Sequence, residues 1–69
     1  MDAPIVVHRP SATGGRRVTA RGRILGLAYS DRDLVVFLEG AGVPDPELIL
    51  DDPRWVEWRD HPAHEWGVA

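Results

Sequence analysis

Apolar and polar residues alternate between Arg16 and Tyr29, which is the spacing of a half-buried β-strand. One parity is apolar and the other is basic or polar: Val18, Ala20, Ile24 and Ala28 against Arg17, Thr19, Arg21 and Arg23. From Leu25 onward the second parity also becomes apolar, which favours a central position in a sheet. The pattern predicts a strand over residues 16–28, with a bulge at Gly22 or Gly26.

The next segment has the period of an amphipathic helix over residues 31–41. Ser30 is a good N-cap, and Asp33 stands three residues later in a variant of the capping box. A single apolar stripe recurs at helical spacing: Leu34, Phe37, Leu38 and Ala41. Gly40 or Gly42 ends the helix. A helix with one apolar stripe is suited to cover a sheet.

The pattern changes again after residue 45. Asp45 is expected to cap a short helix over residues 46–51, with Pro46 at its first position. Alternation returns after Pro53, with one face formed by Val56 and Trp58 and later by His64, Trp66 and Val68. This predicts strands 54–59 and 64–68, paired as a Trp-rich C-terminal β-hairpin. A helix beginning at Asp52-Pro53 is the alternative for residues 53–59.

These elements predict a small α+β fold in two layers. An antiparallel sheet of residues 16–28, 54–59 and 64–68, with 5–8 as an additional edge strand, is covered on one face by the two helices. Residues 1–15 are assigned to an N-terminal arm or edge strand, and residues 16–69 to a single α+β domain. A chain of 69 residues buries only about 60% of its unfolded surface, so its stability is expected to be low. Without Cys, neither a disulfide nor a Cys-based zinc site can add to it.

Composition narrows the range of functions. All eight basic residues are Arg, which we interpret as the codon bias of a bacterial high-GC genome, and the absence of Lys excludes lysine nucleophiles. No apolar run of about 18 residues is present, so no membrane span is expected. The N-terminus lacks the basic start and long apolar stretch of a signal peptide, which predicts a cytoplasmic protein.

No arrangement of residues is typical of an enzyme. The glycines at 14, 15 and 22 do not have the spacing of a phosphate loop. Ser30 with His61 or His64 is a conceivable nucleophile–base pair, but capping explains Ser30 better. A domain of this size also has little room for an enclosed pocket. We therefore expect no catalytic residues and no cofactor.

His61 and His64, with carboxylates at Asp60 and Glu65, are weak candidates for a metal site. Pro62 prevents the helix that would place both imidazoles on one face. A polar turn is the better interpretation, and no metal is predicted.

Trp55 falls on the opposite parity from Val56 and Trp58. If those two face the core, Trp55 lies on the outer face beside Glu57 and Arg59. An exposed Trp flanked by charges is typical of an interface anchor. The alternative is a two-sided core in which Trp55 packs under the N-terminal segment.

The net charge of −3 conceals an uneven distribution. Residues 1–30 hold five arginines and one aspartate, a balance of +4, whereas residues 31–69 hold three arginines and ten carboxylates, a balance of −7. Arg17, Arg21 and Arg23 share a parity on which they could contact phosphates. No aromatic residue is interleaved among them, and the predicted helix 46–51 is acidic, so nucleic-acid binding is disfavoured.

The sequence favours a non-catalytic function: a small binding module or accessory subunit that acts through a Trp-containing interface of Trp55, Glu57 and Arg59. The partner is another protein or a second copy of the chain. The alternative is a protein that binds nucleic acid or an anionic ligand through Arg17, Arg21 and Arg23.

Overall fold

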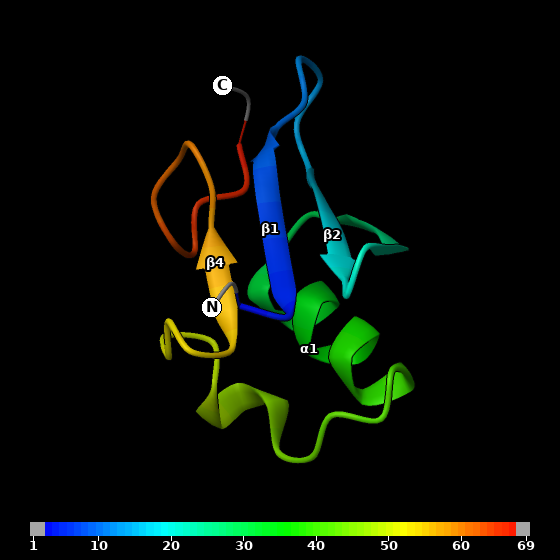
Figure 1. Ribbon diagram of the computed structural model, residues 1–69. Helices are drawn as coiled ribbons and strands as arrows, with labels where there is room; N and C mark the ends of the chain where they lie inside the picture. Colours follow the sequence, from blue (N-terminus) through cyan, green and yellow to red (C-terminus); the bar gives the residue numbers. More distant parts are fainter. Residues whose placement is uncertain (1–2, 68–69) are drawn as a thin grey trace.

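The computed structural model describes residues 3–67, which form a four-stranded mixed sheet with one α-helix against it (Figure 1). In chain order the elements are β1 (Ile5–Pro10), β2 (Arg16–Ala20), β3 (Arg23–Ala28), α1 (Asp31–Gly40), the 3-10 turn η1 (Pro46–Leu48) and β4 (Val56–Trp58). The strands lie in the order β3-β2-β1-β4. The α+β class predicted from the sequence is confirmed.

The alternating segment 16–28 is a hairpin and not the single strand that we predicted, and its second half, β3, lies at an edge of the sheet and not at the centre. Arg21 and Gly22 both have positive φ, 52° and 82°, as the two central residues of a tight hairpin turn require. The predicted bulge lies next to Gly26, because Val18 pairs with Gly26 while Thr19 pairs with Ile24. A Cβ at Gly26 would come within 2.9 Å of the Phe37 ring. The missing side chain therefore lets α1 approach β3 closely.

The sheet is mixed, which corrects the antiparallel prediction. β1, predicted as an edge strand, lies between β2 and β4, and β4 runs parallel to it. The chain leaves β3 at one end of the sheet, passes through α1 and η1, and enters β4 at the opposite end, where β1 also begins. A crossover of this kind produces parallel strands. Residues 54–59 therefore contain a strand, not the alternative helix, but residues 59–67 form none, and Val68 lies outside the described residues.

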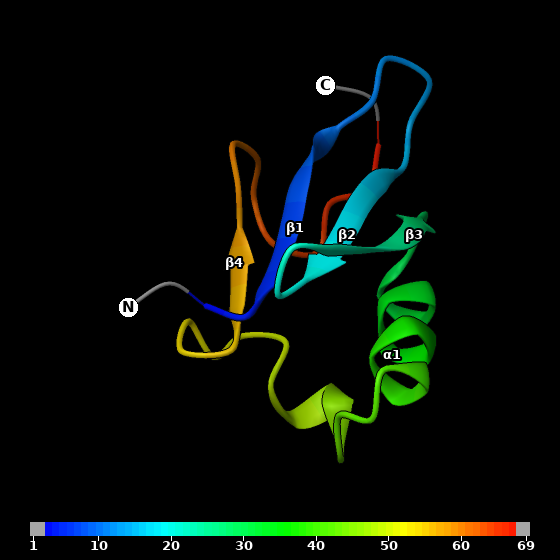
Figure 2. The same ribbon diagram turned by 45° about the vertical axis from the view of Figure 1, so that its right-hand side comes forward.

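The predicted cap of α1 is confirmed, and so is most of its apolar stripe, since Phe37 is partly buried but Ala41 is exposed. The Ser30 hydroxyl accepts a hydrogen bond from the Asp33 N–H at 3.2 Å, and the Asp33 carboxylate accepts one from the Tyr29 N–H at 2.9 Å. Leu34 and Leu38 are fully buried in a core that α1 shares with the sheet and the segment before β4: Ile5, Val7, Val18, Ala28, Leu50 and Val56. Figure 2 shows α1 at the β3 side of the sheet.

The second predicted helix is shorter than expected. Only Pro46–Leu48 is helical, as one 3-10 turn. Asp45 does not cap it, because Asp45 adopts the left-handed conformation, φ 48°, and its side chain makes no capping bond. Pro53, seven residues after Pro46, limits how far a helix could continue.

Arg16 is the largest fully buried side chain in the described part of the chain. It shares a parity with Val18, so the strand directs it into the same side of the sheet as the core. Its guanidinium is surrounded by six backbone carbonyls at 2.7–3.4 Å, those of Val7, His8, Arg59, His61, Pro62 and Glu65. Four of the six belong to the segment that follows β4. One arginine therefore attaches this segment to the sheet.

Two tryptophans complete the surroundings of this guanidinium. The ring centroids of Trp58 and Trp66 lie 5.4 Å and 6.0 Å from the Arg16 Cζ, within the range of a cation–π interaction. The two rings meet edge to face at 5.4 Å. Burial lowers the pKa of Arg16, while the carboxylate of Glu65 raises it. An arginine nevertheless remains protonated at any pH that a protein meets.

We predict that Arg16→Lys destabilises the fold by about 3–5 kcal/mol, because an ammonium is a point charge that cannot replace a planar fork of five donors. Urea unfolding followed by circular dichroism measures the loss. Arg17→Lys is the matched control, since Arg17 is exposed on the same strand and should change stability by less than about 0.5 kcal/mol. Equal midpoints for the two variants would contradict this role of Arg16.

Candidate functional site

The sheet has one face that none of the other described elements covers. Core-facing residues alternate with residues on the opposite side, and cross-strand pairs share a side: Val6 with Thr19 and with Glu57, Arg17 with Leu27, and Thr19 with Ile24. A 3.0 Å contact between His8 Nε2 and Thr19 Oγ1 places His8 there too. Because α1 and segment 59–67 pack on the core side, we call this second side the open face.

Large apolar side chains are exposed on the open face. Ile24 and Leu27 of β3 are 62% and 48% exposed. Trp55 directly precedes β4 and is 40% exposed. Its alternation with buried Val56 places Trp55 on the same side as Glu57. Ile24 and Leu27 therefore lie at one edge of this face and Trp55 at the other. Several exposed large apolar residues on one sheet face are typical of an interaction surface.

Basic side chains gather at one end of the open face. A hollow of about 590 Å³ is bounded by the β1–β2 connection and by residues of three strands, and its lining comprises His8, Arg9, Pro10, Ser11, Ala12, Arg17, Leu27, Arg59 and Asp60. The lining therefore contains three arginines and one histidine but only one carboxylate, that of Asp60. Arg59 is also held by a 2.8 Å ion pair from its Nε to Glu57.

Burial and two neighbouring arginines both act on the imidazole of His8. Partial burial, together with the charges of Arg59 and Arg17, lowers the pKa of His8, and Glu57 only partly opposes this effect. His8 is therefore neutral at neutral pH. An anion bound in the hollow would favour the protonated imidazole and raise that pKa.

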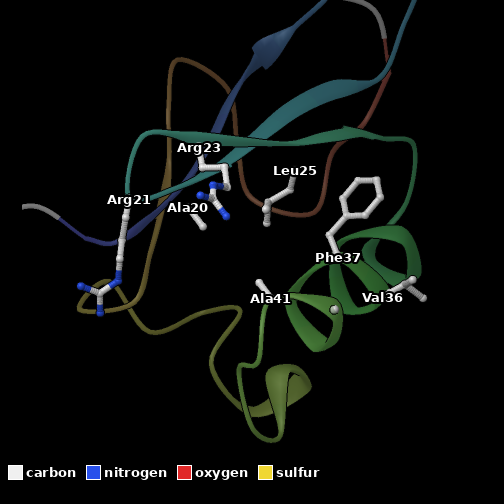
Figure 3. A pocket seen from close by; sticks show the side chains of 8 residues that line it. Ala20, Arg21, Arg23, Leu25, Val36, Phe37 and Ala41 are labelled. Carbon is white, nitrogen blue, oxygen red and sulfur yellow. The ribbon is translucent and has the colours of Figure 1, made fainter.

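The residues predicted as an interface lie together, whereas the predicted anion-binding residues do not. Trp55, Glu57 and Arg59 follow one another along the β4 edge of the open face. Arg17 lies on the same face, in the hollow. Arg21 instead occupies the β2–β3 turn, and Arg23 borders a separate groove between β3 and α1 (Figure 3). A single strand cannot present all three arginines to one ligand, because the hairpin turn interrupts it.

His61 and His64, the weak metal candidates, point to different partners. His61 Nε2 lies 3.5 Å from the Glu65 carboxylate. His64 bridges two carboxylates, with Nδ1 2.7 Å from Asp31 and Nε2 in a short contact with Asp51. The two nitrogens of one imidazole point in opposite directions, so these carboxylates do not converge on a common point. Within residues 3–67, no group of three or more such side chains is arranged to hold a metal.

The His64 cluster links three separated segments. Asp31 begins α1, Asp51 follows η1, and His64 lies in the segment after β4. Trp66 joins them by donating its Nε1–H to the other oxygen of Asp31 at 2.8 Å. The ring of Trp58 lies 5.1 Å from that of His64. The two hydrogen-bonded carboxylates raise the pKa of His64.

Sequence reasoning missed the roles of Arg16, His8 and Leu27. A signal for Arg16 was present, because it alternates with Arg17 and shares the parity of Val18. No such signal existed for His8 and Leu27. Their proximity depends on the pairing of β1, β2 and β3, which no single segment encodes.

We predict that the folded protein becomes less stable as the pH rises through the raised pKa of His64. A group whose pKa is higher in the folded state stabilises the fold when protonated, fully below the ordinary value of 6.5 and progressively less above it. The test compares urea unfolding of the parent and His64→Gln across this range. The difference in unfolding free energy should shrink with rising pH.

Proton NMR of the histidine rings gives the corresponding control. The resonances of His64 should titrate above 6.5 and those of His8 below it. A His64 that titrates at or below its ordinary value, or a stability difference that does not change with pH, would contradict this assignment.

Among residues 3–67, no helix is long and apolar enough to cross a membrane. The chain matches no protein-family model, no curated protein and no solved structure.

Proposed function

We propose that this protein is a non-catalytic binding module that docks an acidic protein surface on its open face. The observation that carries the proposal is that one face of the sheet, left uncovered by the described part of the chain, presents exposed Ile24 and Leu27 at its β3 edge, exposed Trp55 at its β4 edge, and a basic hollow that Leu27 helps to line. Apolar anchors supply most of the binding energy in such interfaces, and charges around them select the partner.

The charge of the hollow supports an acidic partner. His8, Arg9, Arg17 and Arg59 line it together with Asp60, although the chain as a whole is acidic, with a net charge of −3. An acidic surface would meet positive potential at this end of the open face. The same potential would repel a basic partner.

A non-catalytic role is supported by the hydrogen bonds that Ser30 and His64, a candidate nucleophile and a candidate base, already make within the fold. The Ser30 hydroxyl accepts the N–H of Asp33 at the start of α1. Both ring nitrogens of His64 are bound to carboxylates. These groups are therefore used in holding the fold, and they lie on the core side of the sheet, away from the hollow.

A small phosphate-bearing anion is the second candidate ligand, and the presence of three arginines in the lining of one hollow is the observation that favours it. Such a ligand would use Arg17 and its neighbours in the hollow, without Arg21 and Arg23. Titration with inorganic phosphate, followed by the ring resonances of His8, tests this candidate. A pKa of His8 that does not rise with phosphate would exclude it.

We predict that Trp55→Ala leaves the domain folded but weakens partner binding by about 2–4 kcal/mol, as truncation of an interface anchor does. Proteins retained by the immobilised parent from an extract of the expressing cells would be identified, purified and titrated by calorimetry. Leu27→Ser and Arg17→Glu should weaken the same complex.

The matched controls are Val36→Ser and Arg32→Glu, which change an exposed apolar residue and an exposed arginine on α1. They should bind like the parent. By contrast, Trp58→Ala should lose about 3–5 kcal/mol of stability, because Trp58 packs against the core and donates its Nε1–H to Leu50. Unchanged partner affinity in all three open-face variants would refute the proposal.

A further inference from the structure

A groove between β3 and α1 is separate from the open face. It has a volume of about 740 Å³ and is lined by Ala20, Arg21, Arg23, Leu25, Val36, Phe37, Gly40 and Ala41. Most of this lining is apolar, and the two arginines stand at one end. Figure 3 shows the Arg23 side chain reaching from β3 toward the space above α1, with Arg21 at the outer end of the hairpin.

The two arginines of the groove are not neutralised by the described part of the chain. Within residues 3–67, neither Arg21 nor Arg23 forms an ion pair with a carboxylate. Exposed Val36, at 54%, extends the apolar surface along α1. The groove therefore suits an apolar group that has negative charges beside it.

A segment with this chemistry is present in the same chain. Leu48 of η1 is 77% exposed, the highest value among the exposed large apolar residues of the described chain. Exposed Asp45 and Glu47 precede it. The turn is held by hydrogen bonds from the Leu48 N–H to Asp45 and from the Ile49 N–H to Pro46. We call Asp45–Leu48 the acidic knob, because it projects one leucine beside two carboxylates.

We propose that two copies of this protein associate by placing the acidic knob of each in the β3–α1 groove of the other. The charges are complementary, and Leu48 gains the apolar contact that it lacks in the single chain. Within one chain the knob follows α1 and lies beyond its C-terminal end (Figure 3), so it does not fill its own groove. Groove and knob are adjacent on the molecule. A two-fold axis between them would therefore form both contacts at once and close the assembly as a dimer.

This arrangement would bring together parts of the basic and acidic segments of the chain. Arg21 and Arg23 belong to the basic segment 1–30, and Asp45 and Glu47 belong to the acidic segment 31–69. A contact limited to one turn and one groove falls at the small end of the range of protein interfaces, so the dimer is expected to be weak and sensitive to salt. It leaves the open face free.

Sedimentation velocity of the full chain, at protein concentrations from about 10 µM to about 1 mM, tests the proposal. The sedimentation coefficient should rise from the monomer value to that of a dimer, and less so in about 0.5 M salt. Leu48→Ser should raise the dimer dissociation constant at least about tenfold. Leu27→Ser is the matched control, because it removes an exposed leucine from the open face and should leave the dimer unchanged.

A charge exchange identifies the contact itself. Arg23→Glu and Glu47→Arg should each weaken the dimer by about tenfold, and the double variant should regain much of the loss because the opposite charges meet again. Both residues are exposed, so circular dichroism melts should match the parent. Arg9→Glu, with the same change of charge elsewhere, should have no such effect.

Three results would overturn this proposal. One is a monomer at all concentrations. Another is a dimer that Leu27→Ser or Trp55→Ala disrupts while Leu48→Ser does not, which would place the contact on the open face. The third is growth beyond a dimer with rising concentration, which would exclude a closed two-fold arrangement.

Discussion

A guanidinium that is withdrawn from water needs acceptors on every side, and this requirement shapes the structure around Arg16. The acceptors are backbone carbonyls, four of them from the segment after β4. To present these carbonyls, the segment must curl around the charge, and Asp60 and His64 adopt left-handed conformations within it, with φ of 63° and 67°. Conformations of this kind cost roughly 1–2 kcal/mol for residues other than glycine. They persist because the surrounding hydrogen bonds compensate for them.

The same constraint determines what the other side of the sheet presents. Since strand residues alternate, placing Arg16 inward places Arg17 outward, into the hollow with His8 and Arg59. Trp58 packs against the buried guanidinium, and Trp55 lies on the opposite side of the sheet, on the same side as Glu57. The buried arginine and the basic, partly apolar exterior are therefore two results of one strand register. A slip of one residue would exchange them.

Sequence reasoning succeeded where the determining contacts are local. The cap of α1 and its apolar stripe lie within a dozen residues, and the structure contains the cap and all of the stripe except Ala41, which is exposed. Sequence reasoning failed at the hairpin, because the alternation continues through a two-residue turn. Arginine is also not one of the residues that usually indicate a turn position with positive φ. The prediction also failed for β4, whose direction is set by the crossover through α1 and not by its own residues. Parity alone placed Trp55 opposite Val56, but the open face as a surface depends on the pairing of four strands.

The two proposed surfaces use different parts of the fold. The open face belongs to the sheet, where side-chain positions are fixed by pairing on both sides of β1 and β2. The groove and the acidic knob belong to α1 and the connection that follows it, where a single 3-10 turn holds Leu48 in place. A partner on the open face and a second copy at the groove would therefore be bound without competing for the same residues.

The carbonyls that surround Arg16 have a consequence for how the chain reaches its native state. Arg16 is 46 residues from Pro62 and 49 from Glu65 along the chain. During synthesis, the β2–β3 hairpin is made before the residues whose carbonyls accept most of the hydrogen bonds of this guanidinium. The hairpin cannot bury the charge without them, so the core beneath β2 must stay hydrated until residue 65 has been made. Closing loops of this length before any gain in contacts slows folding, and we expect residues 5–65 to fold as one cooperative unit.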